Sequence, residues 1–175
     1  MIPGTGRATE AEGPANGRWA VRLGAAGAVV FVAGAVLPAA IDAAGLPGGS
    51  VLRAAYHPLC HQMPSRSLPW AGHPVAVCAR CAGLYLGGTL GLLLASLARR
   101  AAQVPPGLRW LALAAMPTAL DVMAGQVFGA GLPNVPRLLL SLPAGFVAGL
   151  YLAAGLADLG GSRWTRTLPI FSGPR

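Results

Sequence analysis

The chain has 175 residues, of which 54% are apolar and only 10% are charged. A soluble domain carries about 25% charged residues, so this composition excludes a fully solvated globular surface and indicates an integral membrane protein. The formal charge of +8 comes from thirteen basic residues, all of them arginines. These arginines stand at the ends of apolar segments and form no patch with interleaved aromatic residues, so nucleic acid is not an expected partner.

Four apolar segments follow a polar stretch, residues 1–18, whose Gly, Pro and Glu content predicts a disordered tail. Each segment is long enough to cross a hydrocarbon core of about 30 Å at about 1.5 Å per residue. The segments cover residues 19–44, 77–98, 108–130 and 138–159.

The expected fold is therefore an all-α integral membrane protein, with four transmembrane helices in a compact bundle over residues 19–159. An outer loop that contains cysteine and histidine is expected at residues 47–76, and residues 160–175 predict a short polar tail. The lipid bilayer is the expected surrounding.

The arginines predict the orientation of this bundle. With four spans, both tails and the loop between the second and third spans lie on one side. That side carries nine of the arginines, and the opposite side carries four, which are Arg53, Arg66, Arg80 and Arg137. The positive-inside rule places both tails in the cytoplasm. We therefore expect a multi-pass protein of the cell (inner) membrane whose 47–76 loop faces outward.

Small residues recur every four positions on two of the predicted spans. They are Gly83, Gly87 and Gly91 on the second span, and Gly145, Gly149 and Ala153 on the fourth. Small residues at this spacing allow two helix backbones to approach closely in a membrane. We expect the second and fourth spans to be in contact, and a homo-oligomer is also compatible with such a face.

All three cysteines and two of the three histidines fall within residues 60–81, where the outer loop enters the second span. Cys60 and His61 are followed some 17 residues later by the C-x-x-C pair of Cys78 and Cys81. Two such ligand pairs are typical of a tetrahedral zinc site. A helix start also favours the thiolate form. The sequence predicts a site for zinc or another transition metal at these four residues, with two reserve ligands, His57 and His73.

Two other interpretations of the cysteines stay open. The outer compartment is oxidising, so Cys78 and Cys81, or Cys60 with one of them, could form a disulfide, and Cys78 and Cys81 would be the exchanging pair of an oxidoreductase. This position of a C-x-x-C looks like that in membrane quinone-linked disulfide-generating enzymes, and quinone would then be the cofactor. Those enzymes carry a second cysteine pair, whereas only Cys60 remains here. An inert disulfide with one free thiol is the third interpretation.

Asp121 lies in the third span, where an ionised carboxylate costs about 2.5–3.5 kcal/mol. It is either a relay residue of a small ion or solute transporter or one member of a buried ion pair, for instance with Arg137. The outer arginines could bind an anionic head group or substrate, or extend to the interface. The additional polar residues that the sequence singles out are Gln62, Arg66, Arg80, Asn134 and Arg137.

Four short motifs, two of them with cysteines, resemble a known family. Cys60-His61-Gln62-x-Pro64-x-Arg66-Ser67 is followed by Cys78-Ala79-Arg80-Cys81-x-Gly83-x-Tyr85-x-Gly87, and later by Pro117-x-x-x-Asp121 and Asn134-x-x-Arg137. Together they are similar to the membrane proteins called domain of unknown function 2085, over roughly residues 50–155. The resemblance implies a small polytopic membrane protein. It assigns no activity, so whether the protein is an enzyme, and which small ligand or ion it binds, stays open.

Overall fold

The structure is a computed structural model that describes residues 17–98, 106–129 and 131–160. Most of the two predicted tails, residues 1–18 and 160–175, therefore lies outside the described residues. Arg18 and Gly160, which the sequence assigned to the tails, belong to the first and last helices.

Within the described residues, four helices are long and apolar enough to cross a membrane. They are α1 (Arg18–Ala43), α3 (Ala79–Leu97), α4 (Leu108–Val127) and α5 (Asn134–Gly160). The predicted all-α membrane fold with four spans is confirmed. The largest difference in boundaries is at α5, which begins four residues before the predicted start at residue 138. Pro136 stands in its first turn, where the missing amide hydrogen of proline costs no helical hydrogen bond.

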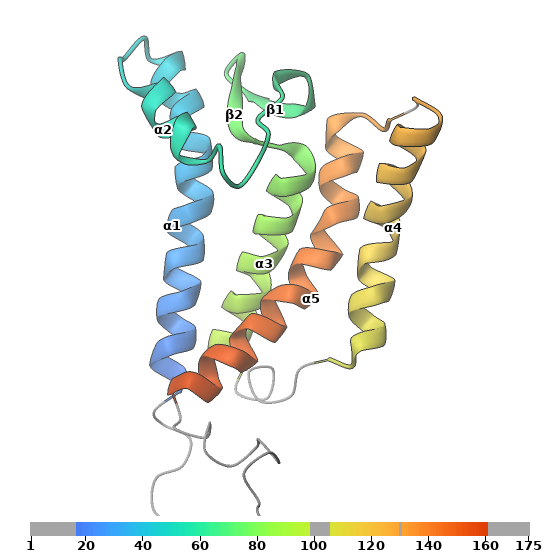
Figure 1. Cartoon of the computed structure of the whole chain (residues 1–175). Coiled ribbons are helices and arrows are strands. Elements are labelled where there is room, and N and C mark those ends of the chain that lie inside the picture. Colours follow the sequence, from blue (N-terminus) through green and yellow to red (C-terminus); the bar gives the residue numbers. More distant parts are fainter. Residues whose placement is uncertain (1–16, 99–105, 130, 161–175) are drawn as a thin grey trace, which may run out of the picture.

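The helix α5 runs obliquely across the others and contacts all three of them (Figure 1). Its start lies beside α4 and its end lies beside α1, so that Gly17 comes close to the backbone of Ala157. The helices α1 and α4 stand on opposite sides of the α3–α5 pair, and the described chain ends on the same side of the bundle at Gly17 and Gly160 (Figure 1).

Glycines make the contact between α3 and α5 unusually close. A methyl group added at Gly87 would overlap the carbonyl oxygen of Leu142, and one at Gly91 would overlap that of Phe146. From the other side, Gly145 lies against the backbone of Leu84. The predicted contact between the second and fourth spans is confirmed, because the backbones approach so closely that a Cβ has no room.

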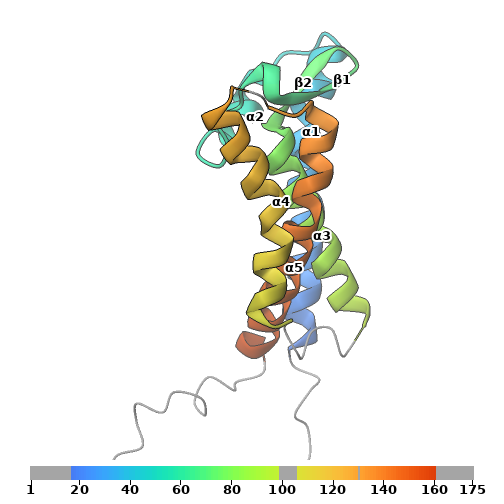
Figure 2. The same ribbon diagram turned by 90° about the vertical axis from the view of Figure 1, so that its right-hand side faces the viewer.

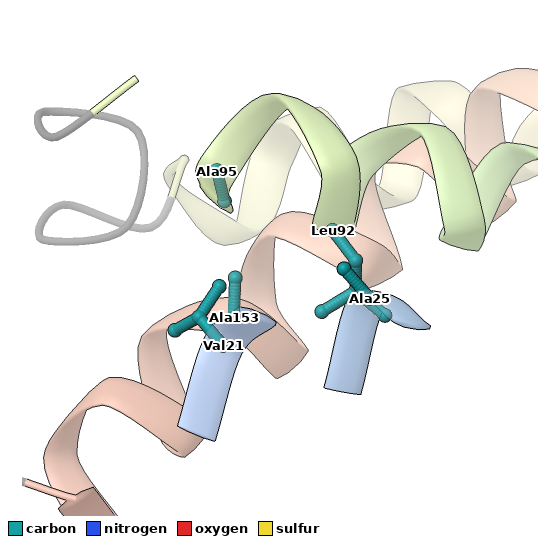
Figure 3. Close-up of a cluster of buried hydrophobic side chains, with 5 residues drawn as sticks. All are labelled: Val21, Ala25, Leu92, Ala95 and Ala153. Atoms are coloured by element: carbon teal, nitrogen blue, oxygen red, sulfur yellow. The ribbon is translucent and has the colours of Figure 1, made fainter. Parts of the chain in front are cut away.

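Beyond the glycines, a small apolar core joins three helices at the end of the bundle where the described chain begins and ends (Figure 3). Each helix contributes residues that are at most 4% exposed. The members of this core are Val21 and Ala25 of α1, Leu92 and Ala95 of α3, and Ala153 of α5.

The predicted outer loop contains regular structure that the sequence did not predict. A short helix α2 (Gly49–Ala55) and a 3-10 turn η1 (Pro64–Arg66) precede the antiparallel strands β1 (Ser67–Trp70) and β2 (His73–Cys78). Positive φ angles of 48° at Ala71 and 84° at Gly72 form the tight turn between the strands. The hairpin packs on the C-terminal end of α1 and leads directly into α3 (Figure 2).

An ion pair fastens this loop to α1. The Arg53 guanidinium lies 2.5 Å from the Asp42 carboxylate and donates to the Pro74 carbonyl at 2.6 Å. One side chain thus joins the end of α1, helix α2 and strand β2, which holds the loop over the bundle.

Gly145→Ala should lower the free energy of unfolding by about 1–3 kcal/mol, because the new Cβ overlaps the Leu84 backbone and forces α3 and α5 apart. Reversible unfolding in detergent measures the change. Gly155→Ala on the same helix is the matched control, since nothing lies within 4 Å of the added Cβ. Its stability should be unchanged or slightly higher, because alanine is the better helix former. Equal losses in the two variants would contradict the close contact.

Candidate metal centre

The three cysteines come together at the start of α3. The sulfur atoms of Cys60, Cys78 and Cys81 all lie within 4.8 Å of one another. All three belong to the described part of the chain, and all three are free thiols. The loop at Cys60 and the start of α3 therefore supply one cluster of soft metal ligands.

The backbone around Cys60 is fixed by local hydrogen bonds. Its amide donates to the carbonyl of Tyr56 at 3.1 Å, and its side chain is buried, with the residue only 6% exposed. Two residues later the chain turns sharply, with Gln62 at a φ of 52°, a left-handed conformation that is unusual for a residue other than glycine. The Gln62 side chain donates to the carbonyl of Arg53 at 2.5 Å and holds this turn in place.

Cys78 and Cys81 lie where β2 passes into α3. Cys78 is the N-cap of the helix and Cys81 lies in its first turn, as the sequence predicted. The Cys78 amide donates to the Cys60 sulfur at 3.1 Å. A hydrogen bond from Cys81 is the main reason why the pKa of the Cys78 thiol falls to about 5, although burial opposes this shift. The lowered pKa of Cys78 favours its thiolate form, which binds metals and attacks disulfides.

Aromatic side chains support the cluster from the side of α1. Phe31 packs against the rings of Tyr56 and Tyr85, with centroid distances of 5.1 and 5.0 Å. The Tyr56 hydroxyl donates to the carbonyl of Phe31 at 2.8 Å, and the Tyr85 hydroxyl donates to that of Leu59 at 3.3 Å. These contacts attach the segment before Cys60 to α1 and α3.

The histidines lie less close to the sulfur atoms. His61 is exposed and lines the pocket beside the cluster, but its ring nitrogens are not among the three clustered ligand atoms. His57 is exposed in the turn after α2, and His73 is half-buried at the start of β2. Neither of these two reserve ligands lines the pocket. A histidine as fourth ligand stays a prediction, with His61 best placed.

A pocket of about 370 Å³ opens beside the thiols. It unites most of the polar residues that the sequence singled out and adds several that it did not. Its described lining consists of Leu59, Cys60, His61, Gln62, Met63, Arg66, Cys78, Arg80, Cys81, Gln126 and Arg137.

Asp121 of α4 is buried beneath two of these arginines. The Arg80 Nε donates to its Oδ2 at 2.7 Å, and the Arg137 Nε lies 3.8 Å from the same oxygen. The Leu132 amide donates to its Oδ1 at 3.3 Å. The sequence hypothesis of an ion pair with Arg137 is confirmed, with Arg80 as the nearer partner. The acid lies six residues before the end of α4, closer to the middle of the helix than to its end.

Asn134, at the start of α5, makes side-chain hydrogen bonds to the outer loop. Its side-chain amide donates to the carbonyls of Ser65 and Ser67, at 3.3 and 3.1 Å. It joins the outer loop to α5, and it is not among the residues that line the pocket.

Sequence reasoning did not include Gln126, Leu59 and Met63 in the site. Gln126 carried one usable signal, since it is a polar residue five positions after Asp121 in an apolar span. The two apolar residues carried none, because their place depends on how the outer loop folds over α3.

A family profile described as predicted membrane protein (DUF2085) matches residues 60–153, which include all three cysteines, Asp121 and Arg137. The chain belongs to this family. The DUF2085 match begins at Cys60, the first residue of the cluster, and extends through the contact between α3 and α5.

Two archaeal relatives are similar to this chain. An uncharacterized protein of Methanocaldococcus jannaschii is 33% identical over 102 residues, which cover 58% of this chain and 65% of the relative. An uncharacterized protein of Methanothermobacter thermautotrophicus is 34% identical over 87 residues, 50% of this chain and 78% of the relative. The chain thus spans just under two thirds of the first relative's length. No solved structure matches significantly.

Arg80→Gln should lower the free energy of unfolding by about 3 kcal/mol, because it leaves the buried Asp121 carboxylate without its nearest partner. Unfolding in detergent measures the change, and Arg109→Gln at the opposite end of the bundle controls for the lost charge. Adding Asp121→Asn to Arg80→Gln should restore much of the loss. A double variant less stable than Arg80→Gln alone would contradict this account.

Proposed function

We propose that this membrane protein of the DUF2085 family binds a transition metal ion, with zinc as the best fit, through Cys60, Cys78 and Cys81. The observation that carries the proposal is the approach of the three sulfur atoms to within 4.8 Å of one another as free thiols. Three sulfurs bound to one zinc ion at about 2.3 Å in a tetrahedral site lie about 3.8 Å apart. A movement of about 1 Å would therefore bring all three sulfurs into reach of one ion.

Further features support thiolate ligands at this place. The amide of Cys78 donates to the Cys60 sulfur, and such hydrogen bonds from the backbone stabilise a negative sulfur. Arg80 and Arg137 line the same pocket, and their charges offset those of the thiolates. An odd number of cysteines is also natural for a three-cysteine site, whereas a disulfide leaves one thiol over.

The fourth coordination position decides what the metal does. His61 lines the pocket and is the candidate protein ligand, which would close the site and make the metal structural. Without His61, the position is open to water or a ligand from the pocket, as in sites that handle substrates. Cobalt substitution distinguishes the two, because His61→Ala changes the cobalt spectrum only if the imidazole is bound.

The orientation follows from the arginines under the positive-inside rule. The hairpin, and with it the cysteine cluster, stands at the opposite end of the bundle from Gly17 and Gly160 (Figure 1). We therefore propose that the metal site faces the outside of the cell (inner) membrane and that both tails are cytoplasmic.

The purified protein should contain about one zinc ion per chain, and Cys78→Ser should lose most of it, because one of three sulfur ligands is removed. Metal analysis together with a free-thiol count measures this. His57→Ala is the matched control, since this histidine lies outside the pocket and should not alter the zinc content. Equal zinc in the native protein and Cys78→Ser would overturn the proposal.

A thiol–disulfide oxidoreductase is the second candidate, and the low pKa of Cys78 beside the Cys81 sulfur favours it. In that reaction the two thiols form one S–S bond and release two electrons and two protons. A membrane quinone, as acceptor, takes up both electrons and both protons and becomes a quinol.

Under this second candidate, the metal-free protein should lose two free thiols per chain when a soluble quinone is added, with one quinol formed for each disulfide. Cys81→Ser should abolish quinol formation, because Cys78 then has no partner in the C-x-x-C pair. Absorbance of the quinol measures the reaction. Retention of all three thiols in excess quinone would exclude this function.

The transporter hypothesis has less support from the geometry. The Asp121 carboxylate is already paired with Arg80 and Arg137, and it accepts the amide of Leu132. A proton or cation relay needs a carboxylate that can exchange its partner. The contacts of Asp121 favour a residue that positions the two arginines.

A further inference from the structure

The pocket beside the cysteines carries an excess of positive charge. Arg66, Arg80 and Arg137 line it, and among its described lining residues there is no aspartate or glutamate. Asp121 pairs with Arg80 and Arg137 from outside this lining. One carboxylate against three guanidinium groups leaves two positive charges without compensation.

A bound metal would not remove the excess. Three thiolates around a divalent ion carry one net negative charge, so one positive charge would remain in the pocket. Without a metal, two positive charges remain beside three neutral thiols, and one remains beside a Cys78 thiolate. The pocket is therefore attractive to an anion whether or not the cysteines hold an ion.

The side chain of Arg137 has a buried hydrogen-bond donor without an acceptor. Its side chain is only 11% exposed, and its Nε is buried without a hydrogen-bond partner. The nearest carboxylate oxygen, Oδ2 of Asp121, is 3.8 Å from the Arg137 Nε and already accepts a hydrogen bond from the Arg80 Nε. A buried donor without an acceptor costs about 1–3 kcal/mol, and more when it is charged. An anion in the pocket would recover this energy.

The arginines are also held in position before any ligand arrives. Asp121 fixes Arg80, and the guanidinium of Arg137 lies against Gly131, where a Cβ would have no room. Side chains that are already ordered lose less entropy when they bind a ligand.

We propose that this pocket binds a phosphate group, either free or as the head group of a lipid. Three guanidinium groups present more donors than the two oxygens of a carboxylate accept, whereas a phosphate offers more oxygens and binds arginine in a bidentate manner. The exposed Leu59 and Met63 form the apolar part of the lining, at the outer end of the bundle where head groups lie. The site uses the arginines and needs no metal, so it goes beyond the function proposed above.

Two probes test the site on the full chain. Calorimetry with inorganic phosphate measures the free anion, and native mass spectrometry after incubation with phosphatidylglycerol or phosphatidylcholine measures the lipid. Arg137→Gln should weaken binding about tenfold or more, since it removes a charged donor. Arg66→Gln, at an exposed side chain, should weaken it several-fold without a folding defect. Arg109→Gln, at the other end of the bundle, should leave it unchanged.

The source of the phosphate follows from which probe binds. Saturable binding of inorganic phosphate supports a free anion, and retention of phosphatidylglycerol alone supports the lipid head group. No saturable binding of either probe, or undiminished binding in both Arg137→Gln and Arg66→Gln, would overturn the proposal. Phosphate binding that disappears together with zinc in Cys78→Ser would also overturn it, because the anion would then sit on the metal. Persistence in Cys78→Ser would support the arginine site even if the metal proposal failed.

Discussion

The close contact between α3 and α5 is the constraint on which the rest of the structure depends. No hydrophobic drive joins helices in lipid, so they associate through packing and hydrogen bonds. The glycines of α3 and α5 bring the two backbones into direct contact at Gly87 and Gly145. Because α5 is held there, its outer end delivers Arg137 next to Arg80 of α3 and Asn134 next to the outer loop. The contact between α3 and α5 therefore holds the bundle together and also positions residues of the site.

The ion pairs of Asp121 with Arg80 and Arg137 also depend on the contact between α3 and α5. Asp121 is the one residue of the described α4 that is buried, and it meets arginines from both α3 and α5. Thr118 adds a hydrogen bond to the Leu140 carbonyl at 2.9 Å. With so little of α4 buried, polar contacts supply much of its attachment. An ion pair that fixes α4 also fixes the arginines of the pocket, so stability and ligand binding share the same side chains.

The cysteine cluster combines residues from a helix start and from a loop. Cys78 and Cys81 are positioned by the start of a membrane helix, whereas Cys60 arrives on a loop that Arg53, Gln62 and Asn134 fasten to three different elements. The helix start and the fastened loop together bring the three sulfur atoms to within 4.8 Å of one another. The pocket opens on the same side, so a ligand held by the arginines would lie next to the sulfur atoms.

The sequence by itself determined the membrane class, the four spans, the glycine contact and the membership of the three cysteines in one site. Each of these features depends on local composition or on a short spacing of residues along the chain. Such patterns can be recognised in the sequence before the fold is known. Only the tertiary structure decided that Asp121 pairs first with Arg80, that Arg53 joins α1 to the hairpin, and that Gln126 lines the pocket. Asp42 and Arg53 are 11 positions apart and Arg80 and Asp121 are 41 positions apart, so these contacts depend on how the outer loop folds and how the helices pack. The sequence pattern of a single helix carries no information on which neighbour its polar side chains will meet.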